Sequence, residues 1–145
     1  MYDDTEVYML SFKFDWDPLL ELHIPILDEQ HQHFFKLGRH IEQLLLTSCA
    51  GVTNQDLLNL LYELRDYVTY HFYEEERIME ELAFPELEAH KLEHQKFLTY
   101  INKIDYTKLC ESPFSELCSL RDKMVSWTFT HIVQQDQKLT HYYKK

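Results

Sequence analysis

The stretch that decides the fold is HFYEEERIMEELAFPELEAHKLEHQKF, residues 71–97. Apolar residues in it recur at intervals of three and four, which places them on one face of an α-helix. A break falls at residues 84–85, where Phe-Pro interrupts the pattern because proline cannot continue a helix. The stretch therefore predicts two successive amphipathic helices. The apolar face of each also carries titratable side chains, which are His71, Glu75, His90 and His94.

The same analysis extends over the whole chain. Further breaks fall at 47–53, around Gly51, and at 110–113. Thr53 followed by Asp56 predicts a helix N-cap, and Ser112 before Pro113 predicts a capping hydroxyl ahead of the last helix. The predicted helices lie near residues 26–46, 54–82, 85–105 and 113–140, after an irregular N-terminal arm at 1–25. We expect a single all-α domain over 1–145, an antiparallel up-down-up-down four-helix bundle.

Composition supports a helical domain and excludes several classes of partner. The 145 residues include only two glycines and four prolines, too few for a many-turned sandwich or barrel. The net charge of −11 is unfavourable for binding nucleic acid or an anionic membrane surface. No apolar run approaches the roughly 18 residues that span a bilayer, and the acidic start does not resemble a signal peptide. We expect a cytoplasmic monomer with reduced thiols, which are Cys49, Cys110 and Cys118.

Histidines interrupt all four apolar stripes at one level of the predicted bundle. One histidine on such a stripe is most often a core residue with a hydrogen-bond partner, but five at one level indicate a shared ligand. These five are His31, His71, His90, His94 and His131. Imidazole and carboxylate ligands suit iron, zinc, copper or manganese, and the set exceeds the four ligands of a tetrahedral zinc ion. The sequence therefore predicts two metal ions. The remaining histidines are predicted to be non-ligands: His23, His33, His40 and His141. The glutamates around Glu75 are predicted to form a solvated face: Glu74, Glu76, Glu80 and Glu81.

Four motifs resemble those of the hemerythrins. They are LDEQH at 27–31, HFYEEERIM at 71–79, HKLEHQKF at 90–97 and WTFTHIVQQD at 127–136. The resemblance extends from Trp16 to Asp136. It implies a non-haem di-iron centre that binds dioxygen reversibly, in a protein that is not an enzyme. It also implies two iron ions per chain, joined by an oxo or hydroxo bridge. In the implied ligand set one iron is held by His90, His94 and His131, the other by His31 and His71, and Glu75 and Asp136 bridge both.

Helical spacing alone does not select Asp136. It follows His131 by five residues, about 140° around an ideal helix, whereas Gln135 lies at a favourable 40° or so. The resemblance and the poor bridging capacity of glutamine both favour Asp136. We therefore expect the helix to widen locally, or to end, near this position.

The resemblance also implies an oxygen pocket formed by Trp127, Thr128 and Ile132. The family commonly has leucine next to the tryptophan, where this chain has Thr128. Two interpretations of this hydroxyl stay open. It holds a water or donates to the bound oxygen, or it bonds back to the carbonyl of Met124, four residues earlier.

Three functional classes are compared. The first is an oxygen carrier, store or scavenger, and the second is an oxygen or redox sensor acting through a partner protein. The third is a di-iron oxidase of the ferritin-like kind, which is disfavoured because the chain has no Glu-x-x-His repeat. A metal-free bundle would leave five buried imidazoles unexplained.

Overall fold

The computed structural model describes residues 13–143, and every regular element in this range is helical. This confirms the all-α prediction. The principal helices are α2 (Pro25–Leu46), α3 (Asn54–Glu81), α4 (Leu87–Asn102), α5 (Tyr106–Glu111) and α6 (Pro113–Trp127). Shorter helical turns are the 3₁₀ helix η1 (Pro18–Leu20), the π-helix η2 (Thr128–Val133) and the 3₁₀ helix η3 (Asp136–His141).

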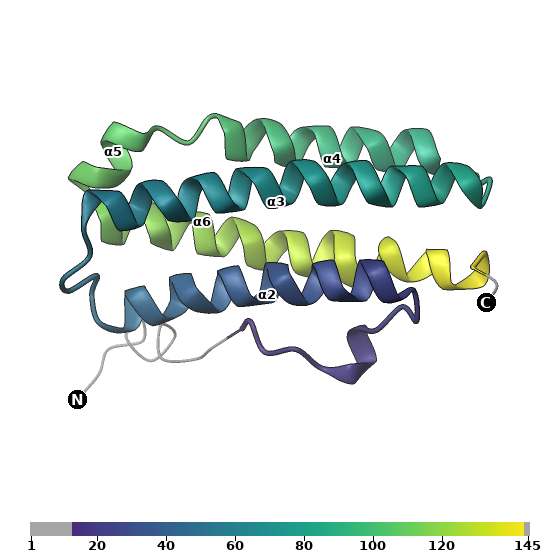
Figure 1. Ribbon diagram of the computed structural model, residues 1–145, viewed down its shortest axis with the longest axis horizontal. Helices are drawn as coiled ribbons and strands as arrows, with labels where there is room; N and C mark the ends of the chain where they lie inside the picture. The colour runs from purple at the N-terminus through teal and green to yellow at the C-terminus, as the bar shows by residue number, and fades with distance from the viewer. Residues whose placement is uncertain (1–12, 144–145) are drawn as a thin grey trace.

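The long helices lie lengthwise side by side (Figure 1), with α2 packed against α3 and α6, and α3 packed against α4. The short helix α5 lies at the end of the molecule away from the C-terminus. Two groups of buried side chains fill the interior, a large one along the long helices and a smaller one around Leu22, Met79 and Leu139. No helix in the described part of the chain is both long and apolar enough to cross a membrane.

The two predicted helix caps differ in outcome. At the start of α3, Thr53 Oγ1 accepts from the Asp56 amide, and the Asp56 carboxylate accepts from the Thr53 amide, each at 3.0 Å. This reciprocal pair confirms the predicted N-cap. The prediction for Ser112 is wrong, because its side chain makes no capping hydrogen bond. Ser112 also ends α5, where its own amide donates to the carbonyl of Lys108.

Two predicted helices end earlier than expected. The third was predicted over 85–105 but ends at Asn102, and the separate helix α5 fills the region predicted as a continuation and loop. The last was predicted over 113–140, but its α-helical part ends at Trp127 and continues as η2 and η3. Neither end carries a glycine or proline; the local signal for the break after α4 is Asp105, whose side chain accepts from the Lys108 amide as the N-cap of α5.

The described part of the N-terminal arm is anchored on α2. The Phe14 ring lies on Gly38, where a Cβ atom would overlap the ring. Glu42 accepts hydrogen bonds from the backbone amides of Lys13 and Phe14, at 2.9 and 3.1 Å. The same carboxylate pairs with buried Arg121 of α6 at 2.6 Å, so the arm, α2 and α6 share one charged anchor.

Candidate metal centre

Seven buried polar side chains meet between the helices. Each is at most 3% exposed, and they come from α2, α3, α4, η2 and η3. They are His31, His71, Glu75, His90, His94, His131 and Asp136. The structure therefore brings together all seven residues that the sequence analysis selected, including Asp136, which helical spacing did not select.

The Glu75 carboxylate faces two groups of imidazoles. Its Oε1 lies 3.0 Å from Nε2 of both His90 and His94 and 3.4 Å from Nε2 of His131. Its Oε2 lies 3.3 Å from Nε2 of His71 and 3.6 Å from Nε2 of His31. One carboxylate therefore divides its two oxygens between a set of three histidines and a set of two.

Asp136 is divided in the same way. Its Oδ1 lies 2.8 Å from Nε2 of His90 and 3.1 Å from Nε2 of His131, both in the set of three. Its Oδ2 lies 3.2 Å from Nε2 of His31 in the set of two. The donor atoms form two clusters, each compact enough for one metal ion: Glu75, His90, His94 and His131; and His31, His71, Glu75 and Asp136.

Several of these donor atoms lack a hydrogen-bond partner, as expected for atoms that bind cations. Among the described residues, His31 Nε2, Glu75 Oε2 and Asp136 Oδ2 are buried without a hydrogen-bond partner, although all three point into the second cluster. In the first cluster, Nε2 of His94 lies 3.0 Å from Nε2 of His131. Adjacent ligands of one ion, each about 2.1 Å from it, stand about 3 Å apart. Buried polar atoms are seldom left without a partner, so this donor set fits metal ions.

Electrostatics keep both carboxylates ionised. Burial raises the pKa of Glu75, but its contacts with His131, His31 and His71 outweigh burial and hold that pKa well below the ordinary value. Burial and the charge of Glu75 also raise the pKa of Asp136, yet His131 and His31 bring it below its ordinary value. Two negative charges in one dry layer require compensation, which protonated imidazoles or metal cations can supply.

The histidines differ in their proton affinity. Burial lowers the pKa of His31, but Asp136 and Glu75 outweigh this effect and raise it to about 9. The same balance raises the pKa of His90 to about 9. For His71, burial prevails over the contact with Glu75 and lowers the pKa. Without metal, protons on His31 and His90 therefore neutralise part of the carboxylate charge at neutral pH.

A local change of helix type positions Asp136. Residues Thr128–Val133 form a π-helix, and a 3₁₀ helix begins at Asp136. The π-helix ends at Val133, and the amides of Gln134 and Gln135 both donate to the carbonyl of His131, so a wide turn is followed at once by tighter ones that bring Asp136 to the side of His131. His131 Nε2 and Asp136 Oδ1 are accordingly 3.1 Å apart. The expected widening of the helix is confirmed.

Two side chains that the sequence analysis did not select bind the outer nitrogens of site histidines. The Nδ1 of His71 lies 2.6 Å from Oε1 of Gln30, and the Nδ1 of His94 lies 2.7 Å from Oε2 of Glu76. In each pair Nδ1–H donates a hydrogen bond to the acceptor oxygen, which leaves Nε2 unprotonated toward the site. The prediction that Glu76 belongs to a solvated face is therefore wrong. Glu76 lies one residue from Glu75 on the side of α3 that meets α4, and only this packing identifies it.

Aromatic rings enclose the centre. Trp127 stacks on His131 with ring centroids 3.9 Å apart, and Phe72 stacks on His94 at 4.0 Å. Beside His71 lies a narrow apolar pocket with no room for a water molecule. Its other walls are Phe34, Tyr67, Val68, Phe72, Phe97, Trp127 and Ile132.

Of the three predicted pocket residues, Trp127 and Ile132 line this pocket and Thr128 does not. Thr128 is buried, and its hydroxyl donates to the carbonyl of Met124 at 3.0 Å. The structure thus favours the second interpretation of Thr128, in which the hydroxyl is satisfied by its own helix.

The other four histidines lie apart from the centre. His23, His40 and His141 are exposed, and the half-buried His33 pairs with Glu63 at 3.5 Å. His23 also has a φ of 61°, a backbone conformation that glycine adopts more readily.

Comparison with known proteins gives a consistent result. Residues 22–142 match the family model described as "Hemerythrin HHE cation binding domain". The chain is similar to the bacteriohemerythrin of Clostridium acetobutylicum, with 25% identity over 86% of this chain and 97% of that protein. A bacteriohemerythrin of Campylobacter jejuni is 25% identical over 89% of this chain and 94% of its own length. One from Stenotrophomonas maltophilia is 28% identical, over 84% and 76% respectively.

Proposed function

The chain belongs to the hemerythrin family, and from that premise we propose that it binds dioxygen reversibly at a non-haem di-iron centre. The observation that carries the proposal is the division of both carboxylates between the two sets of histidines. A carboxylate that offers one oxygen to each of two neighbouring clusters has the geometry of a bridge between two ions.

The proposed ligand sets follow the two clusters. His90, His94 and His131 hold one iron, while His31 and His71 hold the other. Glu75 and Asp136 would each offer one oxygen to either ion. Iron held by these residues would supply reversible binding of dioxygen. The two carboxylates would offset part of the cationic charge, which lowers the desolvation cost of burying the centre.

The surroundings favour binding over turnover. The pocket beside His71 is apolar, and His71 itself is the only titratable side chain on its wall besides the Tyr67 phenol. Such walls exclude water from a small bound molecule. With His71 assigned to the metal and the Tyr67 hydroxyl bonded to the Gln30 carbonyl, they leave no free acid or base for a larger substrate. We therefore propose a carrier, store or scavenger of oxygen rather than an enzyme.

The proposal extends to the molecule as a whole. We take residues 1–145 as one domain with the antiparallel up-down-up-down topology of a four-helix bundle, acting as a cytoplasmic monomer. The packing of α2 with α3 and α6, and of α3 with α4, supports this topology.

Iron analysis combined with absorption spectra tests the function. We expect two irons per chain after anaerobic loading, and a visible band that appears in air and disappears when oxygen is removed. Glu75→Ala should lose both irons, because it removes an oxygen from each cluster. His40→Ala is the matched control, since this exposed histidine lies outside the centre. One zinc ion per chain, or a band that never reverses, would contradict the proposal.

A further inference from the structure

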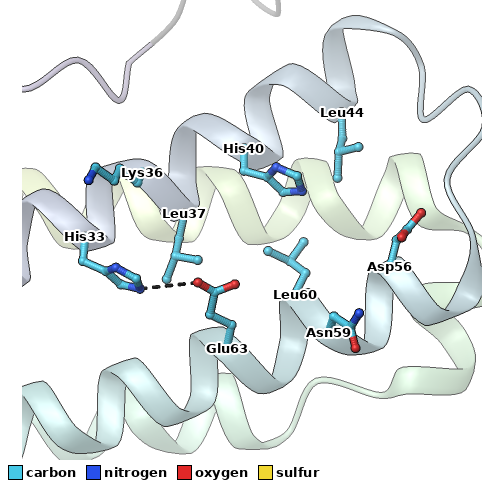
Figure 2. A pocket seen from close by; sticks show the side chains of 9 residues that line it. All are labelled: His33, Lys36, Leu37, His40, Leu44, Asp56, Asn59, Leu60 and Glu63. Atoms are coloured by element: carbon cyan, nitrogen blue, oxygen red, sulfur yellow. Dashed lines mark ion pairs between the residues drawn. The ribbon is translucent and has the colours of Figure 1, made fainter.

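The seam between α2 and α3 is open at the surface. A groove of about 500 Å³ runs along it (Figure 2), lined by His33, Lys36 and His40 of α2 and by Asp56, Asn59 and Glu63 of α3, over a leucine floor. A second cleft of about 410 Å³ shares His33 and Lys36 with this groove. The second cleft also reaches Tyr67, so the open part of the seam continues to that ring.

Tyr67 separates this cleft from the buried pocket. Among the described residues, Tyr67 alone lines both the second surface cleft and the pocket beside His71. On the inner side its ring stacks on the His71 ring, with centroids 5.5 Å apart and planes within 5° of each other. Its centroid also lies 5.9 Å from that of Phe34. On the outer side it contacts the His33 ring at 5.1 Å. One ring therefore stands between the exterior and the pocket beside His71.

The hydroxyl of Tyr67 fixes the ring in this position. It donates a hydrogen bond to the backbone carbonyl of Gln30 at 2.5 Å. The carbonyl belongs to α2, and Tyr67 belongs to α3, so this bond joins the two helices across the seam. The outer neighbour His33 is in turn held by Glu63, as Figure 2 shows.

The opposite side of the molecule is closed more firmly. A cleft of about 140 Å³ between α4 and α6 reaches the same inner pocket through Phe97 and Trp127. These two rings stack on each other with their centroids 4.4 Å apart. The Trp127 ring also stacks on the His131 ring, with centroids 3.9 Å apart. Entry there requires two stacked rings to move, whereas entry on the α2–α3 side requires one.

We propose that Tyr67 is the gate through which dioxygen and other small neutral molecules enter and leave the pocket beside His71. This inference rests on the proposed function for its ligand, while the path itself is a property of the metal-free chain. Rotation of the ring toward the surface cleft breaks its hydrogen bond to Gln30 and opens the pocket. Tyr67 is thus a positioning residue that sets the rate of exchange.

Fluorescence quenching by dioxygen tests the path without iron. The chain has two tryptophans, so Trp16→Phe leaves Trp127 as the only reporter; because Trp127 also lines the α4–α6 cleft, the change relative to the parent, not the constant itself, reports the Tyr67 path. In this metal-free background, Tyr67→Ala should raise the bimolecular quenching constant at least about threefold, because the ring and its stacking contacts are lost. Tyr67→Phe keeps the ring but loses the hydrogen bond, and should raise the constant about two- to tenfold. If the alanine variant does not fold, the phenylalanine variant carries the test.

A matched control and an opposing variant complete the experiment. Tyr70→Ala removes an exposed ring from the same surface cleft but not from the inner pocket, and should leave the constant unchanged. Phe97→Leu tests the α4–α6 side. If the Tyr67 variants match the parent while Phe97→Leu raises the constant, the proposed gate is wrong.

The iron-loaded protein gives a second readout. A gate changes the rates of dioxygen association and dissociation by the same factor and leaves Kd unchanged. We expect this paired acceleration in Tyr67→Phe. A change in Kd with an unchanged association rate would overturn the gate. The absence of a reversible band in the parent protein would instead contradict the proposed function and leave the quenching result valid.

Discussion

At the scale of single residues, orientation of the imidazoles depends on acceptors outside the ligand set. Gln30 and Glu76 each accept a hydrogen bond from the Nδ1–H of a site histidine, at 2.6 and 2.7 Å. These contacts fix both the tautomer and the ring plane, so that Nε2 is presented to the metal. Glu76 has the stronger effect because a hydrogen bond to a charged carboxylate is stronger than one to the neutral amide of Gln30.

Glu76→Gln tests this role. The amide still accepts a hydrogen bond but carries no charge, so we expect iron affinity to fall by about 10- to 100-fold. Competition with a chelator of known affinity measures the change. Glu74→Gln is the matched control, because Glu74 lies on the same helix and pairs with Arg77 outside the centre. Equal affinities in the two variants would show that the contact between Glu76 and His94 does not tune the site.

At the scale of helices, the caps provide an independent check on the fold. Thr53→Ala removes one half of the reciprocal hydrogen-bond pair at the start of α3 and should lower the free energy of unfolding by about 1 kcal/mol. Ser112→Ala should leave it nearly unchanged, because the Ser112 side chain makes no capping bond. Chemical denaturation of both variants measures the difference. A larger loss for Ser112→Ala would contradict the assigned helix starts.

The helices also show which parts of the fold and site can be predicted from sequence. His31, His71, His90 and His94 share faces with buried apolar residues, so periodicity was enough to bring them to one layer. Asp136 was different, because a 3.6-residue period does not hold across a π-helix; the resemblance to a family and the poor bridging capacity of glutamine identified it.

Other features depend on packing between helices. The helix α4 ends at Asn102 without a glycine or proline, and the one local signal, the N-cap Asp105 of α5, lies inside the range predicted as helix. Gln30 binds His71 although it lies 41 residues away in the sequence, a separation that corresponds to no local pattern. Tyr67, which stacks on the same ring, lies only four residues away. A single sequence carries no signal for contacts of this kind, since they are set by the relative placement of two helices.

At the scale of the whole molecule, the buried charges make stability depend on pH when metal is absent. The folded-state pKa values of His31 and His90 are about 9, above the ordinary value near 6.5 in an unfolded chain. Protonation of these groups therefore contributes stability that is complete below about pH 6.5 and lost as pH rises through 9.

We accordingly expect the metal-free protein to lose stability between about pH 6.5 and 9. The iron-loaded protein should change less over this range, because metal ions replace the protons, and it should melt at a higher temperature throughout. Melting temperatures of both forms across the pH range provide the measurement. Stability that rises with pH in the metal-free protein would contradict the assigned charge balance.

The central claim is that two irons, bridged by Glu75 and Asp136, bind one dioxygen reversibly. An anaerobic titration of the fully reduced, iron-loaded protein with dissolved oxygen, followed by removal of the oxygen under argon, tests it most directly. The account predicts uptake of one dioxygen for every two irons, with complete recovery of the oxygen and of the reduced spectrum. Uptake that is not recovered under argon, or no uptake by protein that holds two irons, would contradict it.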